Sequence, residues 1–280
     1  MRLTAVTLAA VICGLPACAA RADTLLQQAR AAATARHLDE AIKLATRALE
    51  AAPDDVAALG LRAELYMETK QPAKAIADFD RVIAKNPQAA HDIDRRGDAY
   101  LMLGKMTEAV ADFDRLLAIS PSTKPQHWRR GIALYYAGRF KDGVEQFESH
   151  QTVNRSDVEN AVWHYLCNAK VVGPEKARQA LIPIRGDPRV PLMTVHALFA
   201  GKAKPDDVLK EAAAGDVSAE RRKNQFFYAH LYLGLYYESV GDAKASLEHM
   251  TKAATEYSNP GYMGDVARVH VQLRKIKGGT

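Results

Sequence analysis

Cysteine, tryptophan and long apolar runs are all scarce in this chain of 280 residues, which has three cysteines and two tryptophans. Cys13 and Cys18 lie near the N-terminus, so only Cys167 remains beyond it, and one thiol cannot form an internal disulfide or a redox pair. Cys167 lies in an apolar helical run, where we expect a buried and inert thiol. The N-terminal apolar run, residues 3–15, is too short to span a bilayer.

Signatures of catalysis and of cofactor binding are also missing. No two of the nine histidines stand at the HExxH interval, and there is no G-x-S-x-G, G-x-x-x-x-G-K or CxxCH motif. His164 and Cys167 are three residues apart on one predicted helix, which leaves a hydrolase as an alternative. No third residue is evident to orient the base of such a pair. We therefore expect a protein that is not an enzyme and has no cofactor or metal.

The charge pattern argues against nucleic acid as a partner. The formal net charge is +5, with 48% hydrophobic and 25% charged residues, an ordinary composition for a soluble protein. The densest basic segments, residues 221–223 and 274–277, are too short for a nucleic-acid footprint, which would show clustered lysine and arginine with interleaved aromatics.

Residues 1–22 have the features of an export signal. A positive start and a short apolar run lead to Ala20 and Ala22, small residues that suit cleavage before Asp23. Residues 15–18 also resemble a bacterial lipoprotein box, with Cys18 as the acylated residue. Both alternatives predict an exported, periplasmic protein that contacts a membrane only through a possible N-terminal lipid.

A period of 34 residues organises the chain from about residue 22 to residue 157. Proline, small residues, phenylalanine, tyrosine and glycine each keep this period, at Pro53, Pro87 and Pro121; at Ala41, Ala75, Ala109 and Gly143; at Phe79, Phe113 and Phe147; at Tyr66 and Tyr100; and at Gly97 and Gly131. This pattern is typical of the tetratricopeptide repeat (TPR), in which each unit is a pair of antiparallel helices. Gly97 and Gly131 are expected to pack helices rather than to bind phosphate.

The repeat predicts an all-α fold, a right-handed α-solenoid of TPR hairpins with a C-terminal capping helix. We expect about five repeats in residues 23–191, with a first helix at about 25–35 and a degenerate fifth repeat from Val158. Residues 192–226 would form an insertion with short helices at about 192–200 and 205–214. Residues 227–280 would add a last hairpin and an amphipathic helix at about 262–276.

The first helix of each TPR repeat lines the concave face of the array, which predicts a protein-binding groove. Six positions in repeats two and three form an expected acidic patch: Glu64, Met67, Glu68, His91, Asp94 and Asp98. Repeat four offers an aromatic shelf of Trp128, Ile132, Tyr135 and Tyr136. Such a groove suits a peptide or helix with basic and apolar residues, since tryptophan and tyrosine are common binding anchors. Core packing of Tyr135 and Tyr136 is the alternative.

Two further segments, residues 127–139 (HWRRGIALYYAGR) and 227–242 (FYAHLYLGLYYESVGD), go beyond the generic repeat. With the stretch between them, their order resembles the periplasmic TPR lipoprotein family called new lipoprotein I, over about residues 56–273. Members of that family are all-helical homodimers that bring a processing protease and peptidoglycan endopeptidases together. The resemblance implies an envelope adaptor with proteases or cell-wall hydrolases as partners, and a possible homodimer. The alternative function is a self-assembling structural TPR protein without a peptide ligand.

Overall fold

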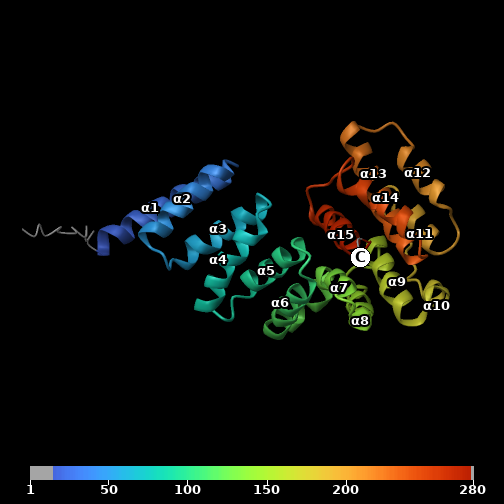
Figure 1. Ribbon diagram of the computed structural model, residues 1–280, viewed down its shortest axis with the longest axis horizontal. Coiled ribbons are helices and arrows are strands. Elements are labelled where there is room, and N and C mark those ends of the chain that lie inside the picture. Colours follow the sequence, from blue (N-terminus) through green and yellow to red (C-terminus); the bar gives the residue numbers. More distant parts are fainter. Residues whose placement is uncertain (1–14, 279–280) are drawn as a thin grey trace, which may run out of the picture. The chain divides into compact units, whose positions relative to one another are not determined.

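The computed structural model describes residues 15–278, and every regular element in that range is helical (Figure 1). The elements in chain order are α1 (Leu15–Thr34), α2 (Leu38–Ala51), α3 (Val56–Glu68), α4 (Pro72–Lys85), α5 (Ala90–Met102), α6 (Met106–Ile119), η1 (Pro121–Gln126), α7 (Trp128–Tyr136), α8 (Phe140–His150), α9 (Val158–Val172), α10 (Pro174–Gln179), α11 (Leu192–Phe199), α12 (Pro205–Ala213), α13 (Ala219–Ser239), α14 (Ala243–Ala254) and α15 (Tyr262–Gly278). The predicted all-α class is confirmed. The chain divides into two compact units, unit 1 (Met1–Arg95) and unit 2 (Arg96–Thr280), with the division inside α5.

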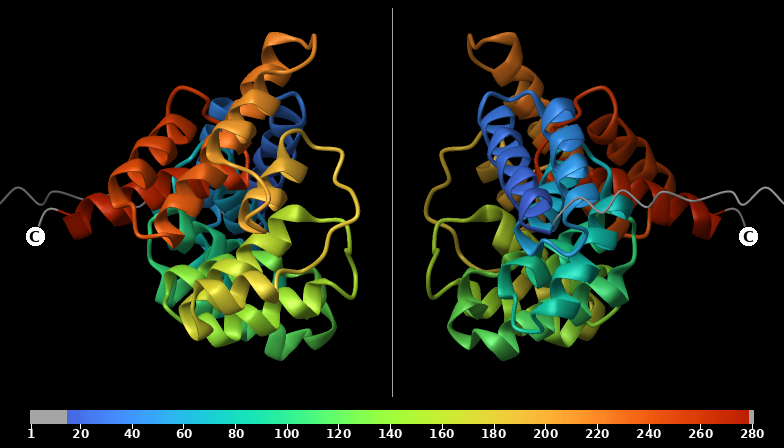
Figure 2. Two further views of the ribbon diagram at one scale, coloured as in Figure 1. Left: turned by 90° about the vertical axis from the view of Figure 1, so that its right-hand side faces the viewer. Right: turned by 90° about the vertical axis from the view of Figure 1, so that its left-hand side faces the viewer.

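Unit 1 is built from helical hairpins that bury small side chains. α1 and α2 lie side by side in Figure 1 and in both views of Figure 2. Ala29, Ala45 and Ala48 are fully buried between the helices, and Leu59 of α3 extends this core. Because alanine adds only a methyl group, the helix backbones can approach closely at these positions.

The turn inside each hairpin is set by one position that recurs every 34 residues. Arg36, Lys70, Gly104 and Gly138 all have positive φ, at 64°, 56°, 74° and 77°. Each follows the first helix of a hairpin and reverses the chain toward the second. Glycine adopts this left-handed conformation without penalty, whereas a side chain adds strain. Unit 1 therefore carries arginine and lysine where unit 2 carries glycine.

Glycines set the closest helix contacts of unit 2. A Cβ atom on Gly97 would lie 2.5 Å from Phe113 Cε1, and one on Gly131 would lie 2.4 Å from Phe147 Cζ. No real Cβ atom approaches so closely, so the phenylalanine rings need glycine at these positions. The prediction that Gly97 and Gly131 pack helices is confirmed.

Most predicted helix positions agree with the structure, and the first differs. The expected helices near 192–200, 205–214 and 262–276 correspond to α11, α12 and α15. α1 instead begins ten residues before its predicted start and runs through the predicted cleavage position after Ala22. Alanine-rich sequence favours this extension, and Pro16 lies in the first turn, where a helix tolerates proline. Residues 1–14 of the predicted export signal lie outside the described residues, while Cys18 is half-buried on α1.

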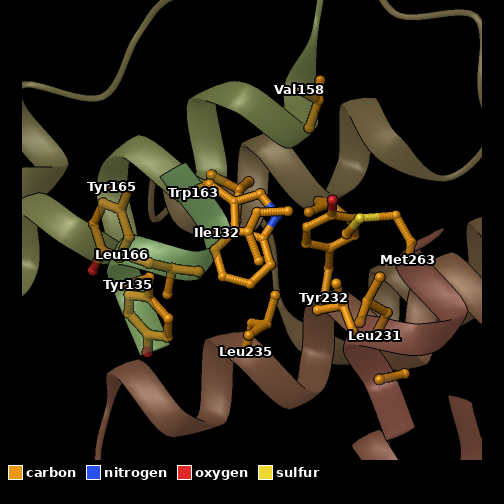
Figure 3. Close-up of a cluster of buried hydrophobic side chains, with 14 of the residues drawn as sticks. Ile132, Tyr135, Val158, Trp163, Tyr165, Leu166, Leu231, Tyr232, Leu235 and Met263 are labelled. Atoms are coloured by element: carbon orange, nitrogen blue, oxygen red, sulfur yellow. The ribbon is translucent and has the colours of Figure 1, made fainter. Parts of the chain in front are cut away.

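α9 is the central helix of unit 2. It is N-capped by Asp157, which accepts a hydrogen bond from the Glu159 amide at 3.1 Å. Buried residues then surround the helix on all sides, including Trp163, Tyr165 and Leu166 (Figure 3). A helix that is buried all round needs neighbours on every face, and α7, α8, α11 and α13 all pack against α9.

Candidate protein-binding site

Two carboxylates of the predicted groove in unit 1 form ion pairs with arginines. Glu64 accepts a hydrogen bond from Arg95 Nε at 2.9 Å, and the exposed His91 ring lies 3.3 Å from the same carboxylate. Glu68 is exposed and forms an ion pair with Arg36. These arginines cancel much of the negative charge, so Glu64 and Glu68 do not form the open acidic patch that the sequence predicts.

Several other predicted groove residues belong to the hydrophobic core. Met67 in unit 1, and Ile132 and Tyr135 in unit 2, are 5%, 0% and 3% exposed. Placing their side chains on an open groove surface was therefore wrong, and core packing of Tyr135 is correct. Asp94 is half-buried on α5.

The two remaining groove residues, Asp98 and Trp128, lie in unit 2. Asp98 is buried and forms an ion pair with Arg129. Trp128 is half-buried at the start of α7. Of the four residues of the predicted aromatic shelf, Trp128 and Tyr136 are half-buried, whereas Ile132 and Tyr135 are buried.

Ion pairs across the helices follow the 34-residue period and explain why the predicted acidic patch is not open. Within hairpins, Arg62 pairs with Asp78 at 2.7 Å and Arg96 with Asp112 at 2.8 Å, and Arg130 reaches Gln146 at 3.1 Å. Between neighbouring hairpins, Arg95 pairs with Glu64, and Arg129 pairs with Asp98. The signal is present in the sequence, because these arginines recur at the same interval as their partners. Our sequence reasoning used the acidic residues alone and missed it.

α15 covers part of the α7 surface in unit 2. The rings of Trp128 and Tyr262 meet edge to face with centroids 5.0 Å apart, and Tyr136 Oη lies 2.9 Å from His270 Nδ1. The guanidinium carbon of Arg274 lies over the Tyr136 ring, 5.7 Å from its centroid. The C-terminal helix therefore does more than cover the end of a helical array: it packs on the face of repeat four that the sequence assigns to a groove.

A pocket of about 300 Å³ remains where the first turn of α15 meets α7, α8, α9 and α13. Its lining consists of Trp128, Ile132, Phe147, Asp157, Glu159, Asn160, Trp163, Arg189, Tyr228, Asn259, Gly261, Tyr262 and Met263. Both tryptophans of the chain are among these residues. Sequence reasoning missed the pocket as such, because its walls come from helices that are distant along the chain.

One side of the pocket carries a half-buried cluster of charges around Arg189. The guanidinium donates to Asp157 Oδ1 at 2.8 Å and to Asp187 Oδ2 at 2.6 Å, and it also pairs with Glu159. Tyr232 Oη donates to Glu159 Oε2 at 2.5 Å. Three carboxylates thus share one guanidinium, which leaves this side of the pocket with acidic character.

The pKa values of the cluster differ according to the balance of burial and hydrogen bonding. Burial raises the pKa of Glu159, against the attraction of Arg189. Burial also opposes ionisation of Asp187, but hydrogen bonds from Arg189 lower the pKa of that carboxyl overall. The same holds for Asp157: burial raises its pKa, but hydrogen bonds from His150 and Arg189 lower that pKa overall. Asp157 and Asp187 therefore hold Arg189 in place as carboxylates.

Two buried polar atoms on the pocket wall lack a hydrogen-bond partner within the described residues. Asn160 is 2% exposed and its Nδ2 donates to the Phe147 carbonyl at 3.2 Å, which leaves Oδ1 without a donor. Trp163 is 1% exposed, and its Nε1 donates to no acceptor. In Figure 3 the indole nitrogen lies on the side of the ring that faces Tyr232 and Met263. Native proteins seldom leave such atoms unpaired, because each costs about 1–3 kcal/mol.

The environment of Cys167 does not favour the hydrolase alternative. Cys167 is fully buried, and a Cβ atom on Gly143 would lie 2.6 Å from its Sγ atom. Burial strongly raises the pKa of the Cys167 thiol and lowers the pKa of His164. A nucleophilic cysteine needs the thiolate form and access to a substrate, so Cys167 acts as a packing residue.

Within residues 15–278, no cluster of three or more histidine, cysteine, aspartate or glutamate side chains could hold a metal ion. None of the helices in this range combines the length and hydropathy that crossing a bilayer requires.

The comparisons with known proteins identify the repeat. Residues 26–90 and residues 94–123 each match a tetratricopeptide repeat family. No relative is found among curated proteins. No catalytic family is indicated by these matches.

Solved structures of TPR proteins share the fold at low sequence identity. A tetratricopeptide repeat protein from Parabacteroides merdae is 13% identical, with a TM-score of 0.60 over 91% of this chain and 99% of the other. YrrB, a TPR protein with an unusual peptide-binding site, is 16% identical, with a TM-score of 0.55 over 64% and 90%. MamA is 15% identical, with a TM-score of 0.53 over 71% and 98%. The chain therefore carries tetratricopeptide repeats in an all-α helical-repeat fold.

Proposed function

We propose that this protein is a non-catalytic adaptor that binds a segment of another protein in the pocket of unit 2. The observation that carries the proposal is the pair of unpartnered buried atoms, Asn160 Oδ1 and Trp163 Nε1, on the wall of an aromatic pocket. Pockets of this kind, apolar with a few convergent polar groups, are the usual form of a binding site. TPR repeats typically serve as protein-interaction scaffolds, and YrrB has a peptide-binding site, which supports the same use here.

The proposal moves the binding site from the groove that the sequence predicts to the pocket beside α15. Trp128 belongs to both, and it offers a half-buried aromatic surface of the type that dominates binding energies. Tyr228 and Tyr262 extend that surface within the pocket.

A display library of random peptides, selected on the full-length protein, tests the proposal. Trp128→Ala should weaken the selected peptides by tenfold or more, because removal of a binding anchor costs about 2 kcal/mol. Tyr237→Ala is the matched control, since Tyr237 is also half-buried in unit 2 but lies outside the pocket lining. Equal loss of affinity in both variants, or no selection at all, would contradict the proposal.

We further propose that the protein is exported and works at the cell envelope, where proteases or cell-wall hydrolases would be its partners. Residues 1–22 and the resemblance in residues 127–139 and 227–242 motivate this proposal. Mass spectrometry of the N-terminus after expression with native export tests it. A chain beginning at Asp23, or at an acylated Cys18, is the expected result, and a chain retaining residues 1–17 in the cytoplasm would contradict it.

We also propose a homodimer, which the resemblance in residues 127–139 and 227–242 supports. Light scattering over a range of concentrations checks it, since a dimer should dissociate on dilution and a monomer should keep one mass. Assemblies larger than a dimer that bind no selected peptide would instead favour the self-assembling structural protein.

A further inference from the structure

We infer that the pocket of unit 2 recognises the side-chain carboxamide of a glutamine or asparagine in the bound protein segment. The inference rests on the proposed function, since it assumes that the pocket holds a polypeptide. It goes further because it names the chemical group that enters.

The pocket wall offers one hydrogen-bond acceptor and one hydrogen-bond donor. Asn160 is oriented by its Nδ2 bond to the Phe147 carbonyl, so its free Oδ1 can only accept. Trp163 Nε1 can only donate. The two residues are three positions apart on α9, so they lie on one face of that helix. An occupant that satisfies both atoms must therefore supply one hydrogen-bond donor and one acceptor close together.

The carboxamide is a side-chain group that supplies both a donor and an acceptor. A carboxamide presents an NH₂ donor and a carbonyl acceptor on one carbon, whereas a carboxylate offers acceptors only and an ammonium offers donors only. Among the charged residues of the lining, Asp157 and Glu159 outnumber Arg189, which disfavours a carboxylate. An ammonium would leave the Trp163 N–H unsatisfied. A neutral carboxamide satisfies both atoms.

The size of the pocket and its apolar surroundings also fit a carboxamide side chain. A volume of about 300 Å³ lies at the lower end of ligand pockets, so it suits a side chain better than a folded element. Ile132, Phe147 and Met263 supply apolar walls for the methylene groups of such a side chain. Trp128 and Tyr262 are half-buried parts of the lining, and they can contact the adjoining residues of the segment.

The two tryptophans make the test direct, because both line the pocket and no other indole is present. Full-length protein labelled with ¹⁵N at tryptophan gives two indole signals to follow in NMR spectra. The probes are three blocked tripeptides, acetyl-Leu-X-Leu methyl ester with X as glutamine, methionine or glutamate, so that only the glutamine peptide carries a primary carboxamide. Methionine matches glutamine in length and lacks the amide, while glutamate matches its shape and carries charge.

The glutamine peptide should bind at least tenfold more tightly than the other two, because the methionine and glutamate peptides leave a buried polar atom unpaired. On binding, the Trp163 indole proton should move downfield as it gains an acceptor. Trp163→Phe removes the donor and keeps the ring, so it should reduce the preference for glutamine by about tenfold. The Trp128 indole signal and circular dichroism report whether this variant folds.

Other outcomes separate the inference from the proposed function. Equal affinity for the glutamine and methionine peptides would overturn the carboxamide and leave a pocket that binds peptide main chain. A Trp163 indole proton that is hydrogen-bonded before peptide is added, and that no peptide shifts, would mean that water fills the site; this too overturns the inference. Selected library peptides that bind without moving either indole signal would overturn the proposed function as well.

Discussion

The two units contain the same 34-residue repeat and use it differently. In unit 1, two carboxylates that the sequence assigns to a groove, Glu64 and Glu68, form ion pairs with neighbouring arginines. In unit 2, α15 packs on α7 and leaves an aromatic pocket with unpartnered polar atoms. The repeat itself therefore builds the scaffold, whereas elements outside the period create the candidate binding site.

The ion pairs inside the hairpins are the feature that both units share, and breaking one has the largest expected effect. Arg96→Met leaves Asp112 without its guanidinium in a site where that carboxylate side chain is 7% exposed. Loss of one partner of such a buried pair should lower the free energy of unfolding by about 3–5 kcal/mol, measured by urea denaturation. Arg62→Met in unit 1 should act similarly through Asp78.

Arg36→Met is the matched control for these two variants. The Arg36 side chain is 71% exposed, so its pair with Glu68 should contribute at most about 1 kcal/mol. An equal effect of the exposed and buried substitutions would show that burial of the pairs is not what matters.

The second prediction contrasts one glycine from each unit. Gly131→Ala in unit 2 would force its Cβ against Phe147 and should cost about 1–3 kcal/mol. Gly60→Ala in unit 1 meets only Asp92 Oδ1 at 3.7 Å, an ordinary contact, and should gain up to about 1 kcal/mol from helix propensity. Thermal denaturation of both variants should thus give opposite shifts, and a loss of stability in Gly60→Ala would contradict the packing described for α3.

The third prediction concerns acid. Asp157 and Asp187 have pKa values lowered below the ordinary 3.8, after the opposing effect of burial, by hydrogen bonds that include Arg189. A lowered folded-state pKa stabilises the fold above the unfolded value, and that stability is lost as the pH falls through the folded pKa. The melting temperature should therefore decrease as the pH is lowered below about 4. Arg189→Met should flatten this dependence, and an unchanged acid slope would contradict it.

The smallest expected effect lies in the turns. Lys70 in unit 1 carries a side chain in the left-handed conformation, so Lys70→Gly removes strain. The free energy of unfolding should rise by up to about 1 kcal/mol, reduced by the larger conformational entropy of glycine in the unfolded chain. Gly104→Ala places a side chain in the same conformation in unit 2 and should lose about 1 kcal/mol. Urea denaturation of the pair checks this, and a gain in Gly104→Ala would contradict the equivalence of the two turns.

The sequence was sufficient for the scaffold, because the repeat is a local pattern. Gly97 and Gly131 were correctly predicted as packing positions from their interval alone. The same interval does not show whether the side chains of Ile132 and Tyr135 line a groove or belong to the core. Both are buried by packing between distant helices. The arginine partners at Arg95 and Arg129 were readable, because they follow the same period.

The pocket could not be predicted from sequence patterns. Asn160, Trp163 and Arg189 carry no motif, and they become neighbours of Tyr228 and Met263 only through long-range packing in unit 2. Trp128 was found from the sequence as an aromatic residue at the start of a repeat helix. Its partner Tyr262 was not, because the repeat does not specify where α15 packs.

The most direct measurement is the NMR spectrum of the two tryptophan indoles with a peptide selected on the full-length protein. Trp128 and Trp163 both line the pocket, so a peptide that binds there should shift both signals in proportion to occupancy. That result would place binding in unit 2, beside α15. Saturating peptide that leaves both indole signals unchanged would contradict this and would direct attention to unit 1.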